Sequence, residues 1–354
     1  MFSDITNVTL YDTLGADSTK YIINQTEMKS VFCTSNHVRD LSELKKSGGI
    51  PSLQNLILYD AGSLEDKKLA EDAGLTILMY DQVVNSGRFA EVDIPDPTTD
   101  SVFTICYTSG TTGDPKGVML SHKNLLCLAT GLDKVNIEIN ERDIHLSYLP
   151  LAHVFERAVL HCMLMKGAAV GFFAGDVFKL KDDIAALRPT IFISVPRLFN
   201  RFFDGMMGKI KELKGFKGTL ANWGLQKKLS NLEKTGETAN SIFDKLVFNK
   251  FREAMGGRIK FMLTGSAPIS KDVLNFLKVA LCCPVYEGYG QTETTAASSI
   301  TLEGDPEVGH VGGVMPYSEL KLVDIPDMDY RSTDEIDGVK IPRGEICYRG
   351  HNNF

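Results

Sequence analysis

A loop rich in glycine and hydroxyl side chains is the part of the sequence best suited to do chemistry. The segment Tyr107–Ser121 reads YTSGTTGDPKGVMLS and follows an apolar, strand-like run, Val102–Thr108. Glycines let backbone N–H groups approach an anion closely, hydroxyls donate further hydrogen bonds, and Lys116 adds positive charge. The loop therefore predicts a polyphosphate site. A mobile surface loop is the alternative, which an unbroken run of Ser, Thr and Gly at 108–113 disfavours.

The spacing in this loop differs from the common nucleotide-binding fingerprints. A Walker A loop that starts at Gly110 would need glycine at position 115 and Ser or Thr at position 117. The sequence has Pro115 and Gly117 instead. A dinucleotide fingerprint starting at Gly288 would need its third glycine at Glu293. The histidines and cysteines have no zinc-type spacing, and no G-x-S-x-G elbow indicates a hydrolase.

The elements that must position this loop are strands alternating with helices. Strands are predicted at 56–59, 76–80, 102–108, 168–173, 190–195, 259–263, 320–323 and 345–348. Apolar residues recur at spacings of one, three and four after Pro196, which predicts a helix there, and Ser270 is a suitable N-cap for another. The alternation predicts an α/β fold with mostly parallel sheets.

Other segments have a different composition. Glu91–Asp100 contains two prolines and four acids and is predicted to be a connector. Residues 214–241 are weakly patterned and are interpreted as a surface excursion, and 324–343 as a surface hairpin. The lysines at 209–217 and at 227–228 are interpreted as solvated helix faces.

The overall composition limits the partners and the compartment. The chain has 38 Lys and Arg against 45 Asp and Glu, a net charge of −7, which argues against a nucleic-acid partner. Apolar residues make up 43% of the 354 residues, enough to bury a large core. Seven cysteines without a CxxC pair predict free, mostly buried thiols in a reducing compartment. The sequence contains no signal peptide and no run of about 18 apolar residues, so we expect no membrane anchor within it.

The segment YTSGTTGDPKGV resembles the phosphate-binding loop of the acyl-adenylate-forming superfamily, which includes acyl-CoA synthetases, luciferases and adenylation domains of peptide synthetases. Further family-like segments follow in the expected order: Leu149–Arg157 (LPLAHVFER), Val195–Asp204 (VPRLFNRFFD), Leu263–Ile269 (LTGSAPI), Val285–Thr294 (VYEGYGQTET) and Gly309–Pro316 (GHVGGVMP). Together with TLYDTLG at Thr9–Gly15, they are most similar to eukaryotic long-chain fatty acyl-CoA synthetases.

The resemblance implies the large N-terminal domain of such enzymes, with stacked, mostly parallel sheets and layered helices (αβαβα) plus a small β portion. It divides the chain into a partial first α/β subdomain at 1–100, an AMP-binding core at 101–316, and the start of a β-rich portion at 317–354. The mobile C-terminal domain is expected to be absent.

The resemblance also implies site residues for ATP, Mg²⁺ and the fatty acid. The β- and γ-phosphates would lie in the loop made by Thr108, Ser109, Gly110, Thr111, Thr112, Gly113 and Lys116. Thr111 and Glu293 would place Mg²⁺, and Thr292 would contact the α-phosphate. The adenine shelf would be formed by Gly265, Ser266, Ala267, Pro268, Glu287, Gly288, Tyr289 and Gly290, with Tyr289 able to stack on the purine.

His153 is expected at the acyl carboxylate, although a lone histidine in an apolar segment is more often a core residue. Residues around Phe155, Arg157 and Val159 are expected to reach the acyl tunnel. Arg157 stands where a bacterial relative has a tryptophan gate, so that gate does not transfer. Arg197 is open to a structural or a substrate-facing role.

The family pattern is incomplete in this sequence. It contains no GWLHTGD-like stretch, in which the family carries a ribose-binding aspartate, and the expected anchor and adenylate-bridging lysine are also missing. We therefore expect a long-chain fatty acid–CoA ligase that is incomplete at both ends, with CoA as co-substrate and little or no activity of this chain alone. A non-catalytic splice form that binds nucleotide or pairs with the full-length enzyme, and an amino-acid adenylation domain, are the alternatives.

Family resemblance suggests the cytosolic face of the endoplasmic reticulum, the mitochondrial outer membrane or the peroxisome, with membrane contact through an anchor outside this chain. The chain alone is expected to be cytoplasmic. Acyl chain length, organelle and oligomeric state, including a homo-oligomer, are left open by the sequence.

Overall fold

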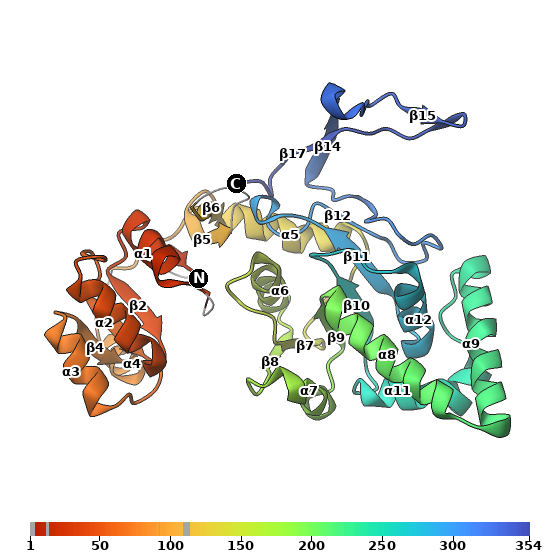
Figure 1. Ribbon diagram of the computed structural model, residues 1–354, viewed down its shortest axis with the longest axis horizontal. Helices are drawn as coiled ribbons and strands as arrows, with labels where there is room; N and C mark the ends of the chain where they lie inside the picture. Colours follow the sequence, from red (N-terminus) through yellow and green to blue (C-terminus); the bar gives the residue numbers. More distant parts are fainter. Residues whose placement is uncertain (1–3, 12–13, 92, 109–113) are drawn as a thin grey trace. The chain divides into compact units, whose positions relative to one another are not determined.

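The protein is described by a computed structural model covering residues 4–11, 14–91, 93–108 and 114–354 (Figure 1). The chain divides into two compact units, Met1–Met119 and Leu120–Phe354, each described here by itself. Strands and helices alternate in both units, which confirms the predicted α/β fold. The boundary between the two units falls inside the predicted AMP-binding core, 101–316, just after the predicted phosphate loop.

The first unit has two small sheets. Its elements are β1 (Asn7–Val8), α1 (Ala16–Gln25), β2 (Ser30–Cys33), η1 (Ser35–His37), α2 (Val38–Lys46), β3 (Asn55–Leu58), α3 (Leu64–Asp72), β4 (Thr76–Met79), α4 (Tyr80–Gly87), β5 (Val102–Thr108) and β6 (Lys116–Ser121), which ends just past the unit boundary. Strands β2, β3 and β4 form a parallel sheet with β3 at its centre. The second sheet has the order β1-β5-β6.

The second unit is built on a seven-stranded sheet of order β13-β12-β11-β10-β9-β7-β8. Its first elements are α5 (His122–Lys134), β7 (Ile144–Ser147), α6 (Val154–Met165), β8 (Ala169–Phe172), η2 (Val177–Lys179), α7 (Leu180–Leu187), β9 (Ile191–Ser194), α8 (Pro196–Glu212) and α9 (Gly215–Thr235). Then follow α10 (Ser241–Phe243), the π-helix η3 (Asp244–Phe248), α11 (Asn249–Ala254), β10 (Phe261–Thr264), α12 (Lys271–Leu281), β11 (Val285–Tyr289), η4 (Thr292–Thr294), β12 (Ser299–Ile300) and β13 (Gly313–Val314). Strands β8, β7, β9, β10 and β11 run parallel, and β12 and β13 are antiparallel additions.

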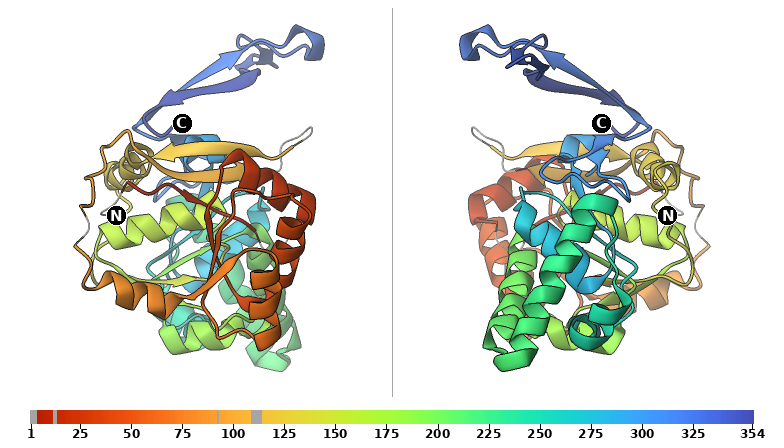
Figure 2. Two further views of the ribbon diagram at one scale, coloured as in Figure 1. Left: turned by 90° about the vertical axis from the view of Figure 1, so that its left-hand side faces the viewer. Right: turned by 90° about the vertical axis from the view of Figure 1, so that its right-hand side faces the viewer.

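The chain ends in an antiparallel ribbon. It consists of β14 (Ser318–Val323), η5 (Pro326–Met328), β15 (Glu335–Ile336), β16 (Val339–Lys340) and β17 (Glu345–Gly350). Figure 2 shows β14 and β17 paired along their length, with the exposed β15–β16 hairpin beyond them. The predicted surface hairpin at 324–343 is therefore confirmed.

Local sequence signals explain the principal helices. Pro196 occupies the first turn of α8, and the Ser270 hydroxyl accepts a hydrogen bond from the Val273 N–H at the start of α12, as predicted. Phe199 of α8 and Leu277 of α12 are both 0% exposed and belong to the largest core cluster. Their burial in this core means that α8 and α12 pack on the same face of the sheet.

Residues 214–241, interpreted from the sequence as a surface excursion, instead contribute to the core. Most of them form the 21-residue helix α9, which buries Ala221, Leu225 and Leu232. Lys228 is likewise not on a solvated face: it is 1% exposed and pairs with Asp244. The apolar face of this helix is hard to recognise in the sequence because the buried Lys228 lies within it.

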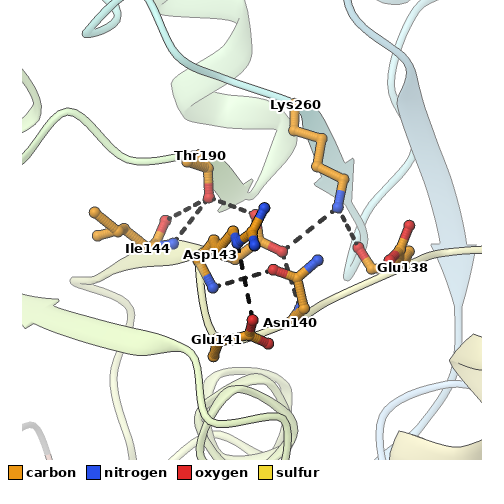
Figure 3. Close-up of polar contacts among 8 residues, drawn as sticks. Glu138, Asn140, Glu141, Asp143, Ile144, Thr190 and Lys260 are labelled. Carbon is orange, nitrogen blue, oxygen red and sulfur yellow. Dashed lines mark hydrogen bonds and ion pairs between the residues drawn. The ribbon is translucent and has the colours of Figure 1, made fainter.

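Three polar residues tie together the amino ends of β7, β9 and β10 (Figure 3). Each strand is directly preceded by one of them: Asp143, Thr190 and Lys260, respectively. We call these three residues the Asp143 cluster. The Thr190 hydroxyl donates to Asp143 Oδ1 at 2.8 Å, and Lys260 Nζ lies 3.5 Å from Asp143 Oδ2. The carboxyl ends of the same strands are left for ligand contacts.

No helix in the described part of the chain is long and apolar enough to cross a membrane. All seven cysteines are free thiols, as predicted, and burial raises the pKa of Cys162 and of Cys283 to about 12. Only Cys106, Cys162 and Cys283 are buried and Cys347 is exposed, so the prediction that most of the thiols are buried is wrong.

Candidate functional site

An apolar cavity of about 240 Å³ lies in the second unit. Its walls come from α5, α6, β9, β10 and the segments around β12, and include Leu128, Val159, Ile193 and Met315. Phe155 and Val159 line it, as the sequence predicted. The cavity can therefore hold the apolar part of a ligand.

Polar groups gather where the cavity meets the carboxyl ends of the strands. His153, Ser266 and Thr292 contribute to its wall there. The buried Thr264 hydroxyl also lines the cavity and has no hydrogen-bond partner among the described residues. Since buried hydroxyls are normally paired, Thr264 is available to a polar ligand group. Ligands of open α/β sheets bind at this end of the strands.

His153 caps the helix that runs along the cavity. Its Nδ1 accepts a hydrogen bond of 3.1 Å from the Phe155 N–H, so the neutral ring carries its proton on Nε2. Desolvation lowers the pKa of His153, which favours this neutral form. An Nε2–H group at the cavity mouth can donate to a carboxylate oxygen.

Arg157 does not reach the cavity, contrary to the prediction for this part of the helix. It is 8% exposed, and its Nε and Nη2 donate to the Leu151 carbonyl at 3.1 and 3.0 Å. Arg157 therefore holds the turn before α6. On the same helix, Glu156 Oε1 lies 3.1 Å from His145 Nε2, and both side chains are fully buried.

The predicted adenine shelf after β10 has a strained backbone. Ser266 has φ +69°, a left-handed conformation that is uncommon outside glycine. Gly265 and Ser266 line the cavity, while Ser266, Ala267 and Pro268 are exposed. Such strain persists where the surroundings impose it and is frequent at binding sites.

The second part of the predicted shelf is divided between the cavity and the opposite side of the sheet. Gly288 and Gly290 line the cavity. The Tyr289 ring stacks on Tyr348, with 6.2 Å between ring centroids. Glu287 is 6% exposed, its Oε2 has no partner among the described residues, and burial raises its pKa.

Gly290 is required by close backbone approach, because a Cβ there would lie 2.0 Å from the Ala296 carbonyl oxygen. This contact shapes the turn that carries Thr292 and Glu293. Thr295 and Ala296 in the same turn have φ +51° and +75°. Thr292 and Glu293 are both partly exposed, so they are accessible to a ligand.

The strained turn is held by a residue that no motif in the sequence indicates. Asn352 is 0% exposed, and its amide donates to the carbonyls of Thr294 at 2.9 Å and Ala297 at 3.3 Å. Asn124 in turn donates to the carbonyls of His351 and Asn353 at 2.9 and 2.8 Å. The adjacent amides Asn352 and Asn353 were the only signal for this role in the sequence.

The predicted phosphate loop joins β5 to β6, with Thr108 and Lys116 at its two ends. Ser109, Gly110, Thr111, Thr112 and Gly113 lie outside the described residues. The Thr108 hydroxyl points to the Lys116 carbonyl at 3.4 Å, and the Lys116 side chain is on the exposed side of the hairpin. The hairpin leaves this lysine accessible to an anion.

The described residues fit a Mg²⁺ ion that is bound together with a nucleotide. They contain no group of three or more His, Cys, Asp or Glu that could hold a metal by itself. Mg²⁺ usually takes one or two carboxylates and completes its shell with phosphates and water. The accessible carboxylate of Glu293 is a suitable single ligand of this kind.

The mostly parallel sheet of the second unit, with an apolar cavity at the carboxyl ends of its strands, is typical of an enzyme domain of the acyl-adenylate-forming type. The chain belongs to the AMP-binding enzyme family, whose family model matches residues 1–354.

Among curated relatives, it is 43% identical over 344 residues to the peroxisomal long chain acyl-CoA synthetase 7 of Arabidopsis thaliana, covering 97% of this chain and 48% of the relative. It is 38% identical over 351 residues to long-chain-fatty-acid–CoA ligase 1 of Homo sapiens, covering 98% and 49%. The chain thus spans about half the length of the curated relatives it matches.

Solved structures share the fold. The adenylation domain of the carboxylate reductase from Mycobacterium chelonae superposes with a TM-score of 0.74 at 23% identity, covering 98% of this chain and 50% of that one. The A-PCP didomain of the carboxylic acid reductase from Segniliparus rugosus, in complex with AMP, gives a TM-score of 0.73 at 25% identity, with 99% and 46% covered. These likenesses confirm the predicted type of N-terminal domain.

Proposed function

We propose that this chain carries the ATP and acyl sites of a long-chain fatty acid–CoA ligase. The reaction joins a fatty acid and ATP into acyl-AMP with release of pyrophosphate, and then transfers the acyl group to CoA. The observation that carries the proposal is the cavity with apolar walls and a polar mouth, in a chain whose curated relatives are named long chain acyl-CoA synthetase and long-chain-fatty-acid–CoA ligase.

The acyl carboxylate is proposed to lie at the mouth of the cavity. There the Nε2–H of His153 can donate to one oxygen while the chain extends along α6. Thr292 lies on the same wall and is proposed to contact the α-phosphate. The reaction brings two anions together, so fixed donors at this point lower the barrier by holding geometry and offsetting charge.

The nucleotide is proposed to bind through three groups of residues. The loop 108–116, with Lys116, receives the β- and γ-phosphates, and Glu293 with Thr111 holds Mg²⁺, which neutralises phosphate charge when bound. Residues 265–268 and 287–290 form the adenine shelf. The strained Ser266 and the close approach at Gly290 support a preorganised surface in these segments.

An amino-acid adenylation domain is the weaker alternative. A substrate amine would need a buried acid in the pocket wall, and no Asp or Glu lines the cavity in the described part of the chain. The apolar walls favour an acyl chain. CoA as co-substrate and a peroxisomal or other organelle location are proposed from the names of the relatives. Membrane contact through an anchor outside this chain is proposed from the family resemblance alone.

Filling the cavity tests the proposal. Ala158 lines the cavity and is 1% exposed, so Ala158→Phe should weaken palmitate binding by about tenfold or more and leave ATP binding unchanged. Ala186→Phe, at an exposed position of α7, is the matched control. Calorimetry would measure the affinity of each variant for palmitate, leucine and Mg-ATP. Equal palmitate affinity in both variants, or preference for leucine, would contradict the acyl site.

The expectation that this chain alone has little ligase activity stays a prediction. ATP–pyrophosphate exchange with palmitate tests it separately from binding. Robust turnover by the 354-residue chain would show that expectation to be wrong while supporting the proposed chemistry.

A further inference from the structure

The cavity has a closed end opposite its polar mouth. Ile137, Ile139, Met163 and Phe261 line it and are all nearly inaccessible, at 2, 6, 1 and 4% exposure. They also belong to one packed cluster. Met163 lies ten residues after His153 along α6, about 15 Å at the helical rise. The buried end therefore limits how far an apolar chain can extend.

We call the four residues at this closed end the floor residues. Two of them, Ile137 and Ile139, lie on a segment without regular secondary structure. The 135–143 loop joins α5 to β7, and its sequence VNIEINERD alternates apolar and polar residues around Ile137 and Ile139. The alternation turns both isoleucines to the cavity and leaves Glu138 exposed. A loop of this kind depends on a few contacts to keep its position.

One of those contacts comes from Lys260. Its Nζ donates to the Glu138 carbonyl at 2.8 Å, between the two isoleucines, and lies 3.5 Å from Asp143 Oδ2 (Figure 3). Lys260 directly precedes Phe261, another floor residue, and its N–H donates to the Thr190 carbonyl at 2.7 Å. The lysine therefore fastens the loop to the start of β10.

We propose that Lys260 sets the depth of the cavity, and with it the longest acyl chain accepted, by holding the 135–143 loop in place. The inference rests on the proposed function, because it assigns chain-length selection to the proposed acyl site. Lys260 acts through Ile137 and Ile139 and does not touch the ligand, so it is a positioning residue. Its side chain is 41% exposed, and the Asp143–Thr190 bond stays when it is replaced, so the sheet should survive.

The test compares Lys260→Met, which keeps the apolar stem, with Lys260→Arg, which keeps a donor. Lys181→Met, on the exposed face of α7, is the control. Displacement of a fluorescent fatty acid would give affinities for saturated acids from dodecanoate to tetracosanoate. We expect Lys260→Met to bind the acids that exceed the wild-type limit about tenfold tighter, with little change for shorter ones. Lys260→Arg and Lys181→Met should keep the wild-type profile.

Hydrogen exchange gives a second readout, in which amides of 135–143 should exchange faster in Lys260→Met. Ile139→Ala deepens the floor directly and should shift the profile in the same direction if Lys260→Met does not fold. An unchanged length profile, or equal loss at every length, overturns the role of Lys260 while leaving the acyl site intact. A wild-type chain that binds no fatty acid of any length overturns the proposed function and this inference together.

Discussion

The side-chain amide of Asn352 donates a hydrogen bond of 2.9 Å to the backbone carbonyl of Thr294, 58 residues earlier in the chain. The Thr295 hydroxyl donates back to the Asn352 carbonyl at 2.7 Å. A fully buried amide thus fixes the turn that carries Thr292 and Glu293. The residues proposed to contact phosphate and Mg²⁺ are held in place from the far end of the chain.

Asn352→Ala should lower the free energy of unfolding by about 2 kcal/mol, because it leaves two carbonyls in the turn without their donor. It should also weaken Mg-ATP binding, since the turn is no longer held. Denaturant titration and calorimetry measure the two effects. Asn249→Ala, at an exposed position of α11, should change stability by less than about 0.5 kcal/mol. Equal effects of the two substitutions would disprove the role of Asn352.

Gly131 allows α5 to pack against Tyr317. A Cβ at Gly131 would lie 2.2 Å from Tyr317 Cε1, so Gly131→Ala should destabilise the protein by about 1–3 kcal/mol through overpacking. Gly205→Ala is the matched control on α8, where nothing lies within 4 Å of the added atom. It should instead stabilise by about 0.5–1 kcal/mol, because alanine favours a helix interior. Thermal and denaturant unfolding of both variants would reveal whether the signs differ.

The buried pair Lys228–Asp244 joins α9 to η3. Lys228→Met leaves the Asp244 carboxylate without its cation and should cost about 3 kcal/mol. Adding Asp244→Leu should recover most of that loss, because neither charge is then left alone. Lys227→Met, one residue away and exposed, should have little effect. A double variant no more stable than Lys228→Met would argue against charge burial as the cause.

His161 should make stability fall in mild acid. Burial lowers its pKa below the ordinary 6.5, so the unfolded chain binds a proton more readily than the folded one. The stabilising contribution is complete above about pH 6.5 and decreases as the pH falls from there towards the lowered folded pKa. Its Nδ1 lies 2.6 Å from the Arg157 carbonyl, and His161→Asn removes the titration while its amide N–H can still donate to that carbonyl. Unfolding free energies of wild type and His161→Asn between about pH 7.5 and 5.5 should converge with acid. A constant difference would exclude this titration.

Much of the second unit could be predicted because its signals are local. The strand before Thr264, the cap at Ser270 and the proline that opens α8 each follow from a few neighbouring residues. Helix α9 was missed because its buried lysine is stabilised by Asp244, a partner that a single-sequence pattern does not show. Propensity patterns count a lysine as exposed.

Residues at the cavity could be predicted from the sequence where a motif specifies them. They could not be predicted where tertiary packing decides which way a side chain points. His153, Gly265 and Thr292 do meet at one cavity. Arg157 turns to the Leu151 carbonyl instead, because side-chain direction depends on tertiary neighbours. Asn352 lay too far along the chain for spacing to connect it with the turn it holds.

The placement of the Asp143 cluster bears on how such a domain can change its substrate. Its ties join the amino ends of β7, β9 and β10, whereas His153, Ser266 and Thr292 stand at the carboxyl ends. Side chains at the mouth can therefore be exchanged without undoing the ties between the strands. A library randomised at positions 266, 267 and 292 should consist mainly of folded proteins, which makes this mouth a favourable starting point for evolving acceptance of new carboxylic acids.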